Sequence, residues 1–367
     1  MNERKSAMEK TKVGVIFGGK SAEHEVSLQS AKNIIDALDR TKFTPVLIGI
    51  DKEGNWHEYE EGNYLLNEDD PKRIALNKAK RGILLHLGKL EDEENVLTQL
   101  DVLFPINHGT LGEDGTLQGM LEMLNLPYVG PNVLSSAVCM DKDIAKKLLQ
   151  LAGIRVAKGV TLTKGMQGEV VYEELVEELG EVLFIKPANQ GSSVGVSKVT
   201  SKEEFLAGVE DAFLYDHKLV VEESVVGREI EVSVLGNEHP RASVPGEILP
   251  QTEFYSYESK YIDEKGAKLE MPAKVSEELE DRLKKEAIKA FEALQCEGLA
   301  RVDFFVTENE SIYVNELNTL PGFTKISMYP KLWELSGLAY TDLITELLQL
   351  AMDRYDRNQK LKSSAFE

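Results

Sequence analysis

Short apolar runs alternate in the first part of the chain with segments whose apolar residues recur at helical spacing. The runs predict strands over residues 13–17, 43–50, 83–87 and 102–106, and the helical spacing predicts helices over 26–38 and 116–124. Strand, glycine turn and helix follow one another as in a parallel, Rossmann-like sheet. Residues 52–100 are charged and rich in turn-forming residues, which predicts a surface insertion. The pattern as a whole predicts an α/β fold.

The pattern changes after residues 127–131, where Pro and Gly bracket a short extended segment that is typical of a domain boundary. A helix is predicted over 141–152 with Gly153 as its C-cap, and strands are predicted over 182–187, 196–199, 219–227 and 228–235. The aromatic and charged segment 251–265 has no sustained period and is typical of a lid loop. Helices are predicted over 277–294, 329–335 and 340–352. The strand at 219–227 is expected to act as a hinge between the second domain and a third.

Two apolar runs near the C-terminus, separated by a polar turn at 308–311, predict a β-hairpin. Because successive side chains of a strand alternate between its faces, Arg301 and Asp303 share one face of the first strand. Glu316 and Asn318 share one face of the second strand, and Glu316 is expected to lie across from Asp303. Two carboxylates and an amide oxygen are suitable ligands for Mg²⁺. A solvated polar face on an edge hairpin would have the same residues, so the hairpin alone leaves both interpretations open.

Glycine-bearing loops follow two of the predicted parallel strands. The turn at 18–21 lacks the G-x-G-x-x-G spacing of dinucleotide-binding folds, which disfavours NAD. The loop after the strand at 102–106 has three glycines, which permit a ligand to approach the carboxyl edge of the sheet. His108 in this loop is expected to face the Glu23 loop, although a lone loop histidine is more often a surface or capping residue. The Gly/Ser loop at 189–195 is not a Walker A loop, and it predicts either a flap over phosphates or a plain surface hairpin.

Composition excludes several classes of protein. The 367 residues include 42 Lys and Arg against 63 Asp and Glu, and the net charge of −21 argues against a nucleic-acid or anionic-membrane surface. The chain lacks an apolar run of the ~20 residues that a membrane helix needs, and its polar start does not resemble a secretion signal. A cytoplasmic enzyme is therefore expected. Cys139 and Cys296 are expected to be buried structural thiols.

Five blocks of sequence, spread over roughly residues 12–352, resemble a known family when they are taken in order. The blocks are Gly18 to Ser27, His108 to Gly115, Met140 to Lys142, Lys186 to Gly195, and Ala300 to Gly322. Together they resemble the ATP-grasp superfamily, and within it the D-alanine–D-alanine ligase family. The resemblance implies a three-domain ATP-grasp architecture: a Rossmann-like substrate-binding domain over 1–130, a lid domain over 131–222 and a catalytic domain over 223–367. It also favours the metal interpretation of the hairpin.

The resemblance implies a role for each residue that matches a motif of the family. The implied catalytic residues are Glu23, Ser192, Tyr261 and Arg301. The implied substrate-binding residues are His108, Lys260, Gly322, Ser327 and Met328. The implied ATP-binding residues are Lys142, Lys186, Ser193, Glu222, Glu223, Val225 and Glu229, and the implied metal ligands are Asp303, Glu316 and Asn318.

These roles imply one reaction, the ATP-dependent ligation of two D-alanines through a D-alanyl phosphate, with release of ADP and phosphate, for peptidoglycan precursors. Glu23, assisted by His108, holds the ammonium group of the first D-alanine, and Ser192 links Glu23 to Tyr261 of the lid. Arg301 stabilises the acyl phosphate and the oxyanion. The family also implies ATP as a substrate, two Mg²⁺ ions for which Mn²⁺ can substitute, and a homodimer.

The lid segment bears on the identity of the second substrate. In related ligases that make D-alanyl-D-lactate, a histidine is typical of this loop and the position matching Tyr261 is commonly not tyrosine. Here Lys260 precedes Tyr261 and the loop has no histidine, so an amine acceptor is expected. A ligase with D-serine or D-lactate as acceptor is one alternative. Another ATP-grasp carboxylate–amine ligase is a second, although it should lack the Glu23 and Tyr261 pair, and a redox or non-catalytic doubly wound protein would explain only the first domain.

Overall fold

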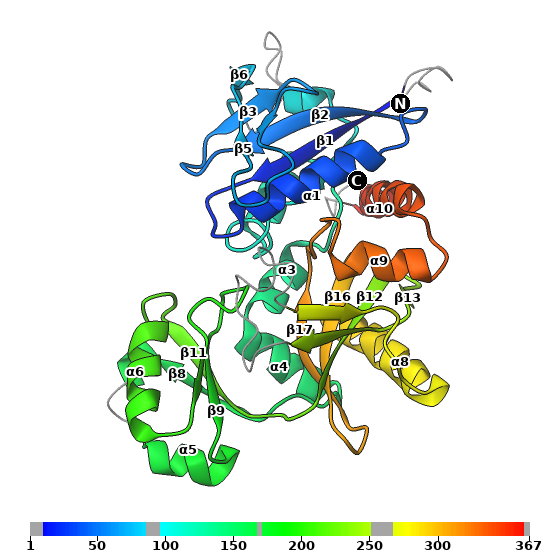
Figure 1. Cartoon of the computed structure of the whole chain (residues 1–367). Helices are drawn as coiled ribbons and strands as arrows, with labels where there is room; N and C mark the ends of the chain where they lie inside the picture. The colour runs from blue at the N-terminus through cyan, green and yellow to red at the C-terminus, as the bar shows by residue number, and fades with distance from the viewer. Residues whose placement is uncertain (1–9, 86–95, 167–170, 251–266, 363–367) are drawn as a thin grey trace.

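The computed structural model of the chain describes residues 10–85, 96–166, 171–250 and 267–362. These residues form three units, each built on its own sheet, together with a two-stranded ribbon. In Figure 1 the N-terminal unit (blue) lies above the C-terminal sheet (yellow and orange), and the central unit (green) lies below and to its left. The α/β fold class predicted from the sequence is confirmed.

The N-terminal unit is a sheet of five strands in the order β6-β3-β2-β1-β7. The strands are β1 (Thr11–Gly18), β2 (Phe43–Ile50), β3 (Trp56–Tyr59), β6 (Arg81–Gly82) and β7 (Val102–Pro105). β1 pairs in parallel with β2 and β7, and α1 (His24–Ala37) forms the crossover from β1 to β2 with Leu28, Ala31 and Ile34 buried. The carboxyl ends of the parallel strands therefore place the loops that begin at Gly18 and Ile106 at one edge.

The predicted surface insertion at 52–100 is in part an extension of this sheet. β3 pairs with the outer edge of β2 in the antiparallel direction, and β6 pairs with β3. β3 is short and contains the charged Glu58, so its sequence does not predict a strand. The Glu58 carboxylate accepts hydrogen bonds of 2.7 Å from Lys80 and Arg81, which makes its burial tolerable.

The predicted strand at 83–87 is wrong in its described part, because residues 83–85 lie outside any strand. The apolar run indicated burial, yet the Leu84 side chain is 82% exposed. The other elements of this region are β4 (Leu65–Leu66), β5 (Ala75–Leu76), the 3-10 helix η1 (Val96–Gln99) and α2 (Thr116–Met123).

The central unit is an antiparallel sheet in the order β10-β9-β11-β8. Its elements are β8 (Gly159–Thr163), η2 (Lys164–Met166), α5 (Tyr172–Leu179), β9 (Leu183–Pro187), β10 (Ser197–Val199), α6 (Lys202–Ala212) and β11 (Lys218–Glu223). The predicted strands at 182–187 and 196–199 are confirmed as β9 and β10, which pair and hold the Gly/Ser loop between them. Leu183, Ile185, Leu219 and Val221 alternate inward along β9 and β11 and form the core of this unit.

The C-terminal unit is a sheet in the order β15-β14-β12-β16-β17, with β13 paired to β12. Its strands are β12 (Arg228–Gly236), β13 (Arg241–Ala242), β14 (Gly246–Pro250), β15 (Ala267–Glu270), β16 (Gly298–Val306) and β17 (Ile312–Asn318). The helices are α8 (Glu277–Ala293), α9 (Met328–Leu335) and α10 (Tyr340–Asn358). The predicted hairpin is confirmed as β16 and β17.

Two helices at the start of the predicted central domain, α3 (Val133–Met140) and α4 (Lys142–Leu151), pack against the C-terminal sheet (Figure 1). Their buried residues Cys139 and Leu149 belong to the same core as Val232 and Val302. Asp141 joins the two helices, and its side chain caps α4 by accepting the Ile144 N–H. This part of the predicted 131–222 domain therefore shares its core with the C-terminal unit.

The end of α4 differs slightly from the prediction. Its C-cap is Ala152, one residue earlier than predicted, and Gly153 follows the cap in the left-handed region with φ of 70°.

The last helix, α10, ties the C-terminal unit to the N-terminal one. Its apolar face shares a core with α1 and the N-terminal sheet. The buried Arg354 of α10 donates to the carbonyls of Gly130 and Tyr128 and stacks over the Tyr128 ring at 4.6 Å. Among the described residues, no helix combines the length and apolar character needed to cross a bilayer.

Replacing Arg354 with Met should lower the free energy of unfolding by about 2–4 kcal/mol, because two buried carbonyls lose their donors. The measurement is urea unfolding. Arg282→Met is the control, since that side chain is 42% exposed and its ion pair within the described residues is with Glu310. Equal losses in the two variants would contradict a bridging role for Arg354.

Candidate active site

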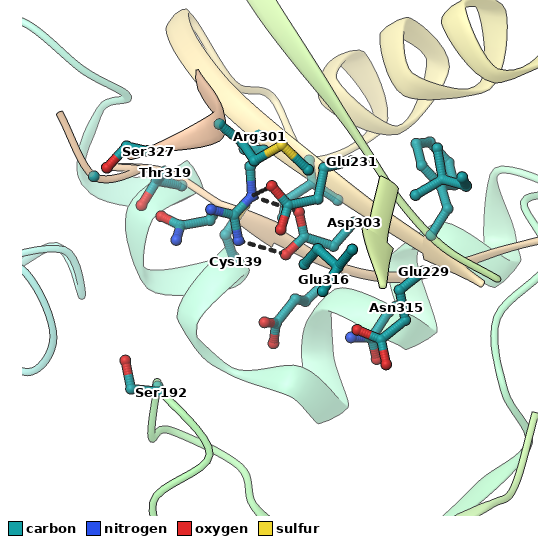
Figure 2. Close-up of a pocket in the computed structure, with 18 of the residues that line it drawn as sticks. Cys139, Ser192, Glu229, Glu231, Arg301, Asp303, Asn315, Glu316, Thr319 and Ser327 are labelled. Atoms are coloured by element: carbon teal, nitrogen blue, oxygen red, sulfur yellow. Dashed lines mark hydrogen bonds and ion pairs between the residues drawn. The ribbon is translucent and has the colours of Figure 1, made fainter. Parts of the chain in front are cut away.

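A cavity of about 640 Å³ lies where the three units meet. Predicted site residues that line it are Glu23, Lys142, Ser192, Glu229, Arg301, Asp303, Glu316, Asn318, Gly322, Ser327 and Met328. Figure 2 shows Asp303, Glu316 and Arg301 around one end of the cavity and Ser192 on the opposite side. Residues that are far apart in sequence thus converge on one space.

The hairpin has the register that alternation predicts, with Asp303 opposite Glu316 and Arg301 opposite Asn318. The Arg301 guanidinium donates two hydrogen bonds of 2.7 Å to the Asp303 carboxylate. Its Nε also lies 3.0 Å from Glu231 Oε2, so a single cation lies between two carboxylates (Figure 2). Such fork-like pairing fixes the plane of the guanidinium.

The chemistry of the hairpin fits a divalent cation. Among the described side chains, the buried Oδ1 of Asn318 accepts no hydrogen bond, which leaves an oxygen available as a ligand. The carboxylates of Asp303 and Glu316 line the same cavity. No group of three His, Cys, Asp or Glu in the described ranges is arranged to hold a metal, so the predicted set depends on the Asn318 amide.

The Gly/Ser loop reaches across the cavity to the N-terminal unit. Ser192 donates a short hydrogen bond to Glu23 Oε1, although the two residues lie 169 positions apart. Ser192 and Ser193 have φ of 53° and 61°, a left-handed conformation that costs free energy in residues other than glycine. Gly109 lies beside the same acid, and a Cβ there would be 2.8 Å from Glu23 Oε2. The structure thus brings the predicted pair Glu23 and Ser192 together.

His108 lies in the buried loop beside this pair. Its Nδ1 lies 2.9 Å from the Leu320 carbonyl, and its Nε2 lies 3.2 Å from the Ser30 hydroxyl. Burial lowers the pKa of His108, and the nearby Glu23 carboxylate opposes that shift. A neutral ring that donates from Nδ1 and accepts at Nε2 satisfies both contacts. His108 therefore ties the N-terminal unit to the loop that carries Gly322.

The two lysines predicted to bind phosphates, Lys142 and Lys186, are held by specific contacts near the Gly/Ser loop at 189–195, which is called the flap from here on. Lys142 Nζ donates to the Gln190 carbonyl at 2.6 Å and lies 3.5 Å from Glu316 Oε2. Lys186 Nζ donates to Glu222 Oε2 at 2.9 Å. Lys142 therefore lies between the flap and the hairpin and contacts both.

The remaining predicted residues divide into three groups. In the loop before α9, the Ser327 hydroxyl accepts a hydrogen bond of 2.9 Å from the Thr324 N–H. A Cβ on Gly322 would lie 2.7 Å from Ser327 Oγ. His108, Lys186, Ser193, Glu222, Glu223 and Val225 do not line the cavity as described. Lys260 and Tyr261 lie outside the described residues.

Two lining acids were not singled out from the sequence, Glu113 and Glu231. Glu231 follows Glu229 by two positions on β12, so the alternation of that strand places both on one face and is a signal that would have found it. Glu113 accepts the Gly109 N–H at 2.7 Å. Burial, and then the nearby Glu23 carboxylate, raise the pKa of Glu113 to about 8.

The fold, with three sheets around one cavity, is that of the ATP-grasp class. Family models described as the D-ala D-ala ligase N-terminus and C-terminus match residues 12–131 and 148–349. The chain therefore belongs to the D-alanine–D-alanine ligase family.

Individual relatives agree with this assignment. The chain is 59% identical to D-alanine–D-alanine ligase of Shouchella clausii, over 98% of this chain and all of that protein. It is 54% identical to D-alanine–D-alanine ligase A of Escherichia coli K12, over 97% of this chain and all of that protein. The D-alanine–D-alanine ligase structure from Coxiella burnetii is similar at a TM-score of 0.80 and 41% identity, over 96% of this chain and 98% of that one. The VanG D-Ala:D-Ser ligase from Enterococcus faecalis has a TM-score of 0.80 and 36% identity, over 94% of this chain and all of that one.

Glu113 should make the stability of the free protein depend on pH. Because the pKa of Glu113 is about 8 in the folded protein against 4.5 ordinarily, the folded state keeps a proton that the unfolded state loses. Its contribution to stability is complete below pH 4.5 and is lost as the pH rises to about 8. In the wild type, the free energy of unfolding should therefore fall between these two pH values. In Glu113→Gln this fall should be smaller by on the order of 2–4 kcal/mol, as measured by urea unfolding across that range. The exposed Glu308→Gln is the control, and a wild-type slope in Glu113→Gln would refute the assignment.

The hairpin acids should govern nucleotide binding in the presence of Mg²⁺. Glu316→Gln is expected to weaken the binding of ADP with Mg²⁺ by about tenfold or more, because it removes one anionic ligand of the predicted metal site. Calorimetric titration measures this change. Glu308→Gln lies in the turn of the same hairpin and should bind like the wild type. An unchanged affinity in Glu316→Gln would rule out its role as a metal ligand.

Proposed function

We propose that this protein joins two molecules of D-alanine in an ATP-dependent reaction, through a D-alanyl phosphate, and releases ADP and phosphate for peptidoglycan precursors. The observation that carries the proposal is that one cavity contains the Glu23–Ser192 pair, Arg301 and the Asp303–Glu316 pair. The names of full-length relatives at 54% to 60% identity support the choice of substrate. We further propose that the reaction takes place in the cytoplasm and that the chain forms a homodimer.

The first step must bring two anions together, the carboxylate of one D-alanine and the γ-phosphate of ATP. Glu23 attracts the ammonium group of that D-alanine, which fixes the end of the molecule away from the reacting carboxylate. Lys142 and Lys186 offset the charge of the phosphates, and Arg301 offsets the charge that develops on the transferred group. Because Arg301 is already oriented by Asp303 and Glu231, it needs no rearrangement during the reaction.

Asp303, Glu316 and Asn318 would hold two Mg²⁺ ions. Mn²⁺ could substitute, because it also prefers oxygen ligands. Bound there, the cation neutralises phosphate charge and fixes the orientation of the nucleotide. Glu229 lines the cavity, and we propose that it contacts the ribose. Glu222, Glu223, Val225 and Ser193 are proposed to contribute to nucleotide binding around the hinge and the flap.

The second step is attack of a free amine on the acyl carbon, which produces an oxyanion that Arg301 can stabilise. The carboxylate of the second D-alanine is proposed to bind at Ser327 and Met328, with Gly322 leaving the space that Ser327 needs. The acyl phosphate must be kept from water. We propose that the flap does this with Tyr261 and Lys260 of the lid, while His108 steadies the loop behind Glu23.

A second acceptor is a specific alternative, because the similar VanG structure is named a D-Ala:D-Ser ligase. With ATP, Mg²⁺ and D-alanine alone, the protein should release phosphate and form the dipeptide in equal amounts. The assay is repeated with D-serine or D-lactate beside D-alanine, and the products are identified by mass spectrometry. No release of phosphate that depends on D-alanine would refute the ligase proposal, and a mixed product in excess of D-alanyl-D-alanine would establish the alternative acceptor.

Tyr261→Phe should raise the use of D-lactate relative to D-alanine by about tenfold, because loss of the hydroxyl loosens the proposed link from the lid to Ser192. Competition between the two acceptors measures the ratio. Tyr257→Phe in the same sequence segment is the matched control. A ratio that is the same in Tyr261→Phe and in the wild type would show that Tyr261 does not select the acceptor.

A further inference from the structure

Lys146 lies one helical turn beyond Lys142 on α4 and is 7% exposed. Its ammonium donates a short hydrogen bond to Glu222 Oε1. The other oxygen of the same carboxylate accepts Lys186 Nζ at 2.9 Å. Lys186 Nζ also lies 3.4 Å from Asn315 Oδ1, beside the hairpin acid Glu316. One buried carboxylate is therefore shared by two lysines.

This sharing leaves a charge of about +1 on the cluster, because two ammonium groups face one carboxylate. Burial would raise the pKa of Glu222, but Lys186 and Lys146 outweigh it and lower the pKa to about 2. Burial lowers the pKa of Lys186, and Glu222 more than offsets it, so the pKa lies above its ordinary value. Burial lowers the pKa of Lys146 to about 8, with only partial compensation by Glu222.

A purely structural role does not account for Lys146. A buried carboxylate needs one ammonium partner, and Lys186 already supplies it to Glu222. Adding a second buried ammonium costs desolvation free energy, which is the reason for the low pKa of Lys146. The residue is therefore better explained by what its charge does to Lys186.

We infer that Lys146 is a positioning residue that shares Glu222 and thereby leaves the Lys186 ammonium available to nucleotide phosphates. This rests on the proposed function of Lys186 in binding ATP. With Lys146 charged, the Glu222 carboxylate is divided between two cations. Without that charge, Glu222 and Lys186 form a one-to-one ion pair with no net charge. Such a pair attracts an anion less strongly than the cluster with a charge of about +1 does.

The charge of Lys146 can also be removed by pH. Among the described residues, the charged groups that act on it most strongly are Glu222 of β11, Lys186 of β9 and Glu316 of β17. Glu222 and Lys186 keep their charge through the range in which Lys146 loses its proton, since the pKa of Glu222 is about 2 and that of Lys186 is raised. Affinity for nucleotide is therefore expected to fall as the pH rises through about 8.

The experiment is a calorimetric titration of the full chain with ADP and Mg²⁺ at constant ionic strength, from about pH 7 to about pH 9.5. ADP is used because binding then needs no D-alanine, whose own amino group titrates in this range. For the wild type, the Kd should rise about tenfold over the range. Lys146→Met should bind ADP about tenfold more weakly than the wild type at neutral pH, and its Kd should change little as the pH rises. Lys146→Arg should bind ADP like the wild type at neutral pH, and its Kd should not rise with pH, because its guanidinium stays protonated.

Lys147→Met is the control on the same helix, since Lys147 is 61% exposed and pairs with Asp143 at 2.8 Å. It should reproduce the wild-type curve. If Lys146→Met does not fold, as judged by circular dichroism, the pH curves of the wild type and of Lys146→Arg still decide the question.

A wild-type Kd that does not change with pH, or a Lys146→Arg curve that rises as the wild-type curve does, would overturn the inference. Wild-type affinity in a folded Lys146→Met variant would do the same. If the wild type does not bind ADP with Mg²⁺ at any pH, the proposed function fails first, so the two failures are distinguishable.

Discussion

A guanidinium held between two carboxylates is the contact around which the cavity is arranged. Arg301 lies between Asp303 on its own strand and Glu231 on the neighbouring one, and the register of β12 with β16 places Glu231 across from Asp303. In a chain with a net charge of −21, acids gathered this closely would repel one another unless a cation lay among them. β16 lies between β12 and β17, so one central strand carries both that cation and a proposed metal ligand.

The other two units reach this centre through polar contacts. The central unit contributes the flap, which is joined to the N-terminal unit through Ser192 and Glu23. α4 begins beside the flap, where the Lys142 N–H donates to the Ala188 carbonyl at 2.9 Å, and its lysines then extend toward the hairpin and Glu222. Hydrogen bonds and ion pairs of this kind depend on orientation, whereas apolar contacts tolerate sliding. The cavity therefore has a defined geometry although its walls belong to separate hydrophobic cores.

The hairpin could be predicted from sequence because its geometry is local: alternation and a short turn are enough to place Asp303 across from Glu316. The contact between Glu23 and Ser192 spans 169 positions, and only the resemblance to a family indicated it. Lys146 was missed because a lysine in an amphipathic helix is usually solvated, and its burial goes with a long-range ion pair to Glu222 of β11. β3 was missed because it is short and charged, and it exists because the edge of β2 offers unpaired backbone groups.

The Glu23–Ser192 contact has a thermodynamic consequence. The acid that is proposed to receive the ammonium group of an amino acid is also the acid that holds the flap. Ligand and flap therefore act on one carboxylate, and their binding free energies are linked. If a docked flap strengthens the hold on the amino acid by some factor, the amino acid must strengthen docking of the flap by the same factor, and a weakening would be equally mutual. The residues that fasten the flap are thus also determinants of affinity for the amino acid, even where they never touch it.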